Sequence, residues 1–208
     1  MTQIDSSDSA SNQEEALSES NAHHVALMLK VKNDQDMVAF EELVEIHQGA
    51  VIGTVAKMLG NPSEAEDIAQ QVFLRIWKSA ARYEPKAKFT TWMFTITRNL
   101  VFNEVRRRKR KPAVSIEERE EATHLVVEDT QAASPGENVL QRELEKAVDD
   151  AIQALPEKQR IGVILRRYEE MPYEEIAIVL GLSVSAVKSL LFRARAQLKD
   201  SLQGYLDS

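Results

Sequence analysis

The sequence lacks cysteine altogether, which excludes disulfide bonds, thiolate nucleophiles and cysteine-ligated zinc or iron–sulfur sites. It also lacks any apolar run close to the roughly 20 residues that a membrane-spanning helix needs. Residues 1–20 are acidic and rich in serine, whereas a secretory leader is basic and then apolar. We therefore expect a soluble, cytoplasmic protein with no membrane insertion.

Signatures of catalysis are also absent from the sequence. The four histidines, His23, His24, His47 and His124, are scattered without the spacing of metal ligands, and there is no Gly-rich phosphate loop. The carboxylates fall on predicted solvated helix faces or in an acidic linker. The residues thus predict no catalytic group, no metal site and no cofactor, and we do not expect an enzyme.

Charge is abundant but segregated along the 208 residues, whose formal net charge is −7. From Arg82 to Lys111 there are ten basic and two acidic residues, whereas from Ala113 to Asn138 there are seven acidic and one basic. The net charge would repel nucleic acid at long range. A surface for a polyanion is therefore expected only where the basic residues gather.

The pattern of apolar residues predicts an all-α protein. Between residues 24 and 59 apolar side chains recur three or four positions apart, which predicts two helices with a break near Asn33 and Asp34. Similar spacing returns after Pro62 and again from residue 139, and no strand-like alternation competes with it. We expect a disordered acidic tail over residues 1–22, a helical bundle over 23–112, an acidic flexible linker over 113–138 and a second helical domain over 139–208.

One predicted helix has clear boundaries and two different faces. It follows Gly60, Asn61 and Pro62, and Ser63 with Glu66 is predicted to form a capping box at its start. An apolar stripe along it predicts one buried face. The opposite face carries Asp67, Gln70, Gln71, Leu74 and Lys78. From the residues alone, this second face is predicted to be solvated.

The stretch from Ile176 to Leu198 has the pattern of a helix-turn-helix. Gly181 stands where the chain must turn, apolar residues on both sides fix the angle between the helices, and Ser183 can cap the second helix. The polar residues of that second helix are Ser185, Lys188, Ser189, Arg193 and Arg195. Serines near its start and basic residues beyond them suit the major groove of duplex DNA. The alternative is a helical hairpin with a basic, solvated side.

A second basic segment, residues 83–111, interleaves aromatic and cationic side chains. Its members are Tyr83, Lys86, Lys88, Phe89, Trp92, Phe94, Arg98, Phe102 and a basic run that includes Arg106 and Arg107. Aromatic rings stack on unpaired bases and cations follow the backbone, so this composition is typical of a surface that holds a single strand. The alternative, a core of aromatics with a solvated basic helix end, stays open on composition alone.

Three stretches, in this order, resemble a known family: PSEAEDIAQQVFLRIW, YEPKAKFTTWMFTITRNL and ALPEKQRIGVILRRYEEMPYEEIAIVLGLSVSAVKSLLFRARAQL. Together they are similar to the extracytoplasmic-function (group 4) branch of the bacterial sigma-70 factors, over about residues 25–203. The resemblance implies a sigma region 2 helical bundle, a linker and a sigma region 4 helix-turn-helix. It also implies a subunit that binds core RNA polymerase, recognises the −35 and −10 promoter elements and promotes promoter melting.

The resemblance implies roles for particular residues. Asp67 and Gln70, with Gln71 and Leu74 on the same face, would dock the β′ clamp helices of core polymerase. Asn99, Asn103 and the loop from Tyr83 to Thr90 would hold unpaired bases of the −10 element, whereas Lys188, Ser189, Phe192 and Arg193 would enter the −35 major groove. The family further implies a contact with the β flap and an anti-sigma factor as a partner. The acidic linker resembles a segment that threads cationic channels of the polymerase.

Two positions depart from the family. Leu190 stands where many relatives have arginine and Phe192 where many have histidine, so part of the −35 contact set is expected to be apolar. A leucine can touch a thymine methyl but cannot bond a phosphate, so the −35 sequence cannot be taken from relatives. No further domain is expected after Ser208.

Two interpretations of the helix-turn-helix follow, and they differ in their need for polymerase. In a sigma factor, the acidic tail and linker would shield the basic surfaces, so that the free protein binds promoters poorly. The rival is a stand-alone transcription regulator that binds an operator by itself. Such a regulator would need neither the aromatic and basic segment nor the acidic linker.

Overall fold

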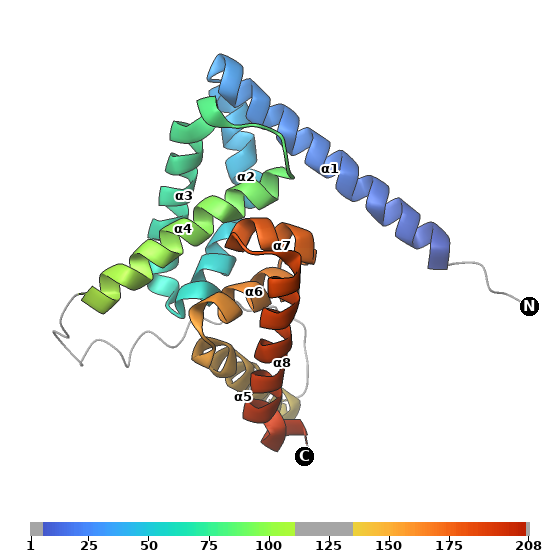
Figure 1. The fold of residues 1–208 in the computed structure, drawn as a ribbon, viewed down its shortest axis with the longest axis vertical. Helices are drawn as coiled ribbons and strands as arrows, with labels where there is room; N and C mark the ends of the chain where they lie inside the picture. Colours follow the sequence, from blue (N-terminus) through green and yellow to red (C-terminus); the bar gives the residue numbers. More distant parts are fainter. Residues whose placement is uncertain (1–5, 111–134, 207–208) are drawn as a thin grey trace, which may run out of the picture.

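The described part of the chain consists of helices and the short connections between them. The computed structural model describes residues 6–110 and 135–206, and no strand occurs in those ranges (Figure 1). The first domain comprises α1 (Ser6–Asp34), α2 (Met37–Leu59), the 3₁₀ helix η1 (Pro62–Glu64), α3 (Ala65–Ser79), the 3₁₀ helix η2 (Ala80–Arg82) and α4 (Phe89–Arg110). The second comprises α5 (Pro135–Ala154), α6 (Glu157–Arg167), α7 (Tyr173–Leu180) and α8 (Val184–Leu206). The all-α prediction is confirmed.

The amino-terminal segment differs from the prediction of disorder over residues 1–22. Helix α1 begins at Ser6 and extends well beyond the rest of the first domain (Figure 1). Its packed part includes Leu27, Met28 and Val31, which are buried. Extending an existing helix is far easier than nucleating one, and no glycine or proline interrupts residues 6–34. Residues 1–5 lie outside the described ranges.

The predicted breaks between helices agree with the structure, but one predicted cap does not. Asp36 caps α2 by accepting a hydrogen bond from the Ala39 amide at 3.1 Å. Asn61 caps η1 and accepts from both the amide and the hydroxyl of Ser63, at 3.1 and 2.7 Å. Because Ser63 is committed to Asn61, the expected capping box with Glu66 is absent and Glu64 precedes α3 without a side-chain cap.

The two domains pack directly against each other. Helix α7 lies on α4, and α5 and α6 contact α2, so the buried residues of both domains form one continuous core (Figure 1). Most of the predicted linker of residues 113–138 lies outside the described ranges, and its last residues, 135–138, belong to α5. The prediction of two tethered domains therefore missed a direct contact between them.

No single helix in the described ranges is long and apolar enough to cross a membrane. The α7–α8 pair meets the length and composition test only jointly, across a bend of 97°.

Candidate nucleic-acid interface

The helix-turn-helix is built as the sequence predicts. Gly181 ends α7 with a φ of 65°, a left-handed conformation that residues with a Cβ adopt only at a cost. The hydroxyl of Ser183 accepts a hydrogen bond from the Ala186 amide at 3.2 Å, so it caps the start of α8. All six predicted −35 residues of α8 are exposed: Ser185, Lys188, Ser189, Phe192, Arg193 and Arg195.

Leu190 does not belong to this exposed face. Only 5% of its surface is accessible, and it packs over Gly162 of α6, where a Cβ would meet a Leu190 methyl at 2.9 Å. The expectation that Leu190 contributes an apolar contact to DNA is therefore wrong in this structure. The position faces the core, and Gly162 provides the space that the leucine fills.

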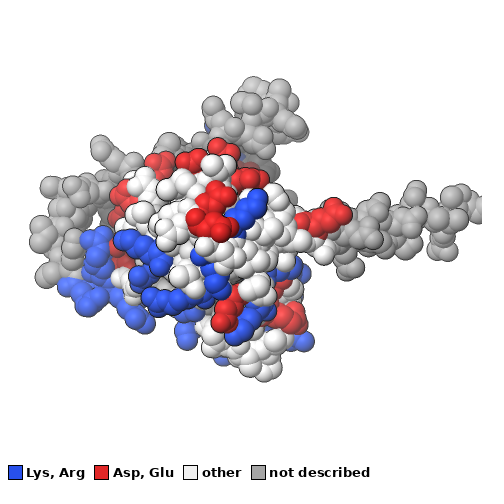
Figure 2. Space-filling view, turned by 90° about the horizontal axis from the view of Figure 1, so that it is seen from above, with Lys and Arg blue, Asp and Glu red and all other residues white. Residues whose placement is uncertain are grey.

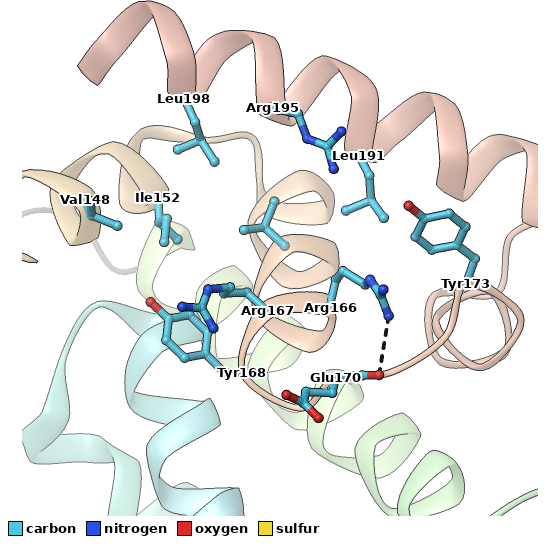
Figure 3. A pocket seen from close by; sticks show the side chains of 11 residues that line it. Val148, Ile152, Arg166, Arg167, Tyr168, Glu170, Tyr173, Leu191, Arg195 and Leu198 are labelled. Atoms are coloured by element: carbon cyan, nitrogen blue, oxygen red, sulfur yellow. Dashed lines mark hydrogen bonds between the residues drawn. The ribbon is translucent and has the colours of Figure 1, made fainter. Parts of the chain in front are cut away.

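Arg195 lies at the border of a second surface that the sequence did not predict. A groove of about 860 Å³ runs between α5, α6 and α8, and in Figure 3 the Arg195 side chain points into it. Its apolar lining includes Val148, Ile152, Val163, Leu191 and Leu198, and its cations are Arg166, Arg167 and Arg195. Arg166 is held by the carbonyl oxygens of Glu170 and Met171, at 3.4 and 3.1 Å. The apolar stripe of α5 was a signal for this surface, because Val148 and Ile152 of that stripe line the groove.

In the first domain, three of the aromatic residues predicted to stack on bases are buried: Tyr83, Phe89 and Phe94. Tyr83 and Phe89 are 0% exposed, and their ring centroids lie 6.4 Å apart. Trp92 is half-buried, with its centroid 4.9 Å from that of Tyr83. None of the three buried residues presents a ring face to a base, so the alternative interpretation, aromatics as core, is right for Tyr83, Phe89 and Phe94.

The polar members of the same segment do reach the surface. Asn99, Asn103, Arg106 and Arg107 are exposed along α4. Arg98 is half-buried with its guanidinium 5.4 Å from the Phe102 ring centroid, and burial lowers the pKa of Arg98. In Figure 2, Lys and Arg side chains gather toward the left, the side on which α4 ends in Figure 1.

Glutamates of the same domain partly neutralise the basic end of α4. Glu104, whose side chain is 8% exposed, receives hydrogen bonds from Arg107 at 2.7 and 2.8 Å and from Arg108 at 3.3 Å. The Arg107 hydrogen bond above all holds the pKa of Glu104 below its usual range. Arg108 also pairs with Glu64 at 2.8 Å. Among the cations predicted to bind the −10 strand, Arg106 is exposed and makes no ion pair with a described carboxylate.

The predicted polymerase-binding face is exposed as a unit. Asp67, Gln70, Gln71 and Leu74 all lie on the solvent side of α3, and Leu74 is 57% exposed. This face adjoins the basic surface of α4, because a pocket of about 500 Å³ is lined by Asp67 and Gln71 from α3 and by Asn103 and Arg107 from α4. The residues predicted to bind polymerase and those predicted to bind the −10 strand therefore lie next to each other.

Lys88 has a partner that sequence reasoning did not find. Its ammonium lies 2.8 Å from the Oε1 atom of Glu175, and the Thr91 hydroxyl donates to Oε2 of the same carboxylate at 2.9 Å. Glu175 belongs to α7, so a residue predicted to contact the −10 strand is bound by the second domain. No local sequence pattern signals a contact over 84 residues.

Three of the four histidines, expected to be scattered, meet at one place. The ring centroids of His24 and His47 are 4.5 Å apart, and those of His23 and His24 are 6.0 Å apart. Burial, and then the charge of His24, lower the pKa of His47 to about 4. Within the described ranges no group of three or more potential ligands could hold a metal ion, and His124 lies outside them.

Two family descriptions match the chain on the surfaces described above. Residues 43–111 match "Sigma-70 region 2", which covers α3 and α4, and residues 145–198 match "Sigma-70, region 4", which covers the helix-turn-helix. The order and positions of the two matches agree with the two helical domains of the structure. The stretch between them contains the acidic segment.

Known relatives extend the match to most of the chain. The RNA polymerase sigma-H factor of Pseudomonas aeruginosa is 32% identical over 193 residues, covering 86% of this chain and 98% of that protein. The ECF RNA polymerase sigma factor SigW of Bacillus subtilis is 31% identical over 176 residues, covering 83% and 92%.

Solved structures share the fold at lower identity. CnrH, in complex with the cytosolic domain of CnrY, has a TM-score of 0.64 at 24% identity, covering 88% of this chain and 98% of that one. The sigma factor RpoE of Bartonella quintana, in complex with the anti-sigma factor NepR, has a TM-score of 0.62 at 23% identity, covering 79% and 96%. With both sigma regions matched and near full-length relatives above 30% identity, the chain belongs to the sigma-70 family of RNA polymerase sigma factors, in its extracytoplasmic-function branch.

Proposed function

We propose that this chain binds core RNA polymerase, directs it to promoters by recognising −35 and −10 elements, and promotes promoter melting. The observation that carries the proposal is the exposed polar face of α8 in a capped helix-turn-helix, on the same chain as a region 2 domain. A duplex-reading helix and a strand-binding domain in one protein suit a site that is read partly as duplex and partly as single strand.

In the second domain, α8 would read the −35 duplex. Ser185, Lys188, Ser189, Phe192 and Arg193 lie on its exposed side, where serine and the cations can bond base edges and phosphates. Leu190 is excluded from this set because it is buried. Arg195 is shared with the groove beside α5, so its contribution to DNA binding is expected to be smaller than that of Arg193.

In the first domain, α4 would capture the −10 strand. Asn99, Asn103 and Arg106 are its exposed polar residues, and half-buried Trp92 and Arg98 flank them. Tyr83 and Phe89 support this surface from below rather than stacking on bases, because both rings are buried. Holding flipped bases offsets the few kcal/mol that unpairing and unstacking cost, so melting needs no chemical step.

Two surfaces would bind the core enzyme. The exposed face of α3, made of Asp67, Gln70, Gln71 and Leu74, is proposed to dock the β′ clamp helices. The groove between α5, α6 and α8 is proposed to receive an apolar segment of the β flap, because its lining is apolar and its cations would favour an acidic rim on the partner. An anti-sigma factor is proposed as a further partner, by similarity to the structures of CnrH and RpoE in their complexes.

The decisive experiment compares promoter binding and run-off transcription with and without sigma-free core polymerase, on the promoter upstream of the protein's own gene. Specific binding and initiation are expected only when core is present. Tight duplex binding by the protein alone, without initiation, would instead identify the rival operator-binding regulator.

Two substitutions separate the proposed surfaces in the same assay. Arg193→Ala should weaken promoter binding by the holoenzyme by about 1–3 kcal/mol while leaving core binding unchanged. Asp67→Ala should do the reverse, with core binding lost first. Arg193→Ala holoenzyme with wild-type promoter affinity would remove Arg193 from the −35 contact set.

A further inference from the structure

The single aromatic ring on the exposed face of α8 is placed where it can determine base preference. Ser185, Ser189 and Phe192 are four and then three residues apart, so they lie on one face of the helix. Phe192 is 73% exposed, whereas its neighbours Leu190 and Leu191 are buried in the core. The ring therefore adds nothing to the packing of the domain and stands in the middle of the polar face.

The surroundings of the ring restrict what it can recognise. Lys188 and Arg193 lie on either side of it, and both are exposed cations that can bind phosphates. A phenyl ring neither donates nor accepts an ordinary hydrogen bond, so it cannot read the polar edges of bases. The apolar group that a base offers in the major groove is the C5 methyl of thymine.

Resting on the proposed function, we propose that Phe192 reads a thymine methyl in the −35 element and makes this protein prefer thymine at that position. The flanking cations hold the helix to the backbone, and the ring covers the methyl group. A histidine at this position would instead have ring nitrogens that can bond polar base edges, so the preferred base should then differ.

The test removes the methyl group alone. Each thymine of the −35 element is replaced in turn by deoxyuridine, and promoter affinity is measured for holoenzymes carrying wild-type protein, Phe192→Ala and the control Tyr205→Ala. Tyr205 is an aromatic residue in the same helix and is 51% exposed. At one thymine, loss of the methyl should weaken the wild type and Tyr205→Ala about fourfold, the worth of one buried methyl group, and leave Phe192→Ala unchanged.

Equal sensitivity of all three proteins at every thymine would overturn the proposal. So would a Phe192→Ala variant with normal promoter affinity that has lost binding to a protein partner, because the ring would then serve that partner. Failure of the proposed function is distinguishable, since the wild-type holoenzyme would then not initiate at all.

A separate observation, the contact between the two domains, supports a second inference. Glu175 of α7 binds both Lys88 and Thr91, and its own side chain is only 15% exposed. Three more contacts join the domains nearby. Thr54 donates to Glu169, Gln153 donates to the Lys57 carbonyl at 2.5 Å, and the Lys57 ammonium lies 4.3 Å from the Tyr168 ring centroid.

This contact occupies part of the surface proposed for the −10 strand. Lys88 precedes α4, one turn before Trp92, and a phosphate and the Glu175 carboxylate would compete for the same ammonium group. Helix α7 also lies against α4, so the first helix of the DNA-reading motif is held on the other DNA-binding domain (Figure 1). In this arrangement the two domains cannot bind two promoter elements that lie far apart.

We infer that α7 acts as an internal competitor of the −10 strand, with Glu175 as the residue that holds the free protein closed. Binding to polymerase and promoter must separate the domains and release Lys88. This contact between described residues would act in addition to the expected shielding by the acidic tail and linker, which stays a prediction.

The test uses the full-length chain, whose lack of cysteine allows specific labelling at two introduced thiols. The substitutions Lys78→Cys and Lys199→Cys place one label on an exposed site of α3 and the other on an exposed site of α8. Energy transfer between the labels reports closure, and a single-stranded −10 oligonucleotide reports access to α4. Glu175→Gln should lower the transfer and tighten oligonucleotide binding by the free protein about threefold to tenfold.

The neighbouring Glu174→Gln is the matched control, because it removes the same charge from an exposed position of α7. Similar changes in both variants would show only a general effect of charge and would refute the inference, as would no change in Glu175→Gln. Core-dependent initiation by the wild type tests the proposed function independently of either result.

Discussion

The two proposed DNA-binding surfaces use their aromatic residues in opposite ways. In the first domain Tyr83 and Phe89 are fully buried, whereas in the second domain Phe192 is 73% exposed. Both sequences mix aromatic and cationic residues, so composition does not separate them. The position of each ring on its helix separates the two surfaces. Phe192 shares a helix face with Ser185 and Ser189, whereas Phe89, at the start of α4, packs against His24 and His47. An aromatic residue near cations is evidence of base stacking only when its helix face is also known.

The largest effect should come from removing the buried ring. Phe89→Ala is expected to lower the free energy of unfolding by about 3–5 kcal/mol, because it leaves a cavity in the core of the first domain. Phe192→Ala should stay within about 0.5 kcal/mol of wild type, because its ring is exposed. Urea unfolding of the full chain, followed by circular dichroism, measures both. A stable Phe89→Ala variant with weakened −10 binding would mean that this ring contacts DNA after all.

Acid should also destabilise the first domain more than the second, although the loss of unfolding free energy should be somewhat smaller than in Phe89→Ala. Burial, followed by the charge of His24, lowers the pKa of His47 to about 4, whereas an unfolded histidine has its ordinary value of 6.5. The unfolded chain thus binds more protons between these values, and stability falls as the pH falls from 6.5 toward 4. The loss from His47 is about 3 kcal/mol between pH 7 and pH 4.

The second domain, residues 139–208, contains no histidine, so the first domain should unfold first on acidification. Both tryptophans, Trp77 and Trp92, lie in the first domain, and their fluorescence reports its unfolding. His47→Leu should reduce the pH dependence of that transition relative to wild type at pH 7, 5.5 and 4.5. An unchanged pH profile in this variant would show that other groups govern the acid response.

The smallest expected effect concerns the start of the reading helix. Ser183→Ala removes the hydroxyl that accepts from the Ala186 amide and should cost about 1 kcal/mol of stability. Ser201→Ala, in an exposed part of the same helix, serves as the control and should be close to neutral. Differential scanning calorimetry compares the two variants. Equal melting temperatures would mean that water replaces the cap without loss.

The features that the sequence predicts correctly depend on neighbouring residues. The breaks before α2, at Pro156 and at Pro172 follow from local turn and proline chemistry, and Gly181 and Ser183 adopt their expected roles in the helix-turn-helix. The exposed face of α3 and five of the six exposed residues of α8 follow from helical spacing, whereas Phe192 was expected there only from the family resemblance.

The features that the sequence does not predict depend on what lies opposite a residue in space. Phe89 is buried where His24 of α1 and His47 of α2 pack against its ring, and Leu190 is buried because Gly162 leaves room for it. The capping box failed because Asn61 had already engaged Ser63. The Lys88–Glu175 pair joins segments far apart in the chain, and helical periodicity carries no information about such pairs.

The closed arrangement has a consequence for how the protein's activity scales with its abundance. Because Lys88 and Glu175 belong to one chain, their encounter is unimolecular and its equilibrium does not change on dilution. A separate inhibitor can be outnumbered when a sigma factor is overproduced, but an internal competitor is always present at one copy per molecule. Raising gene dosage would therefore leave the closed fraction of free molecules constant, and the supply of unoccupied polymerase would set how many of them open.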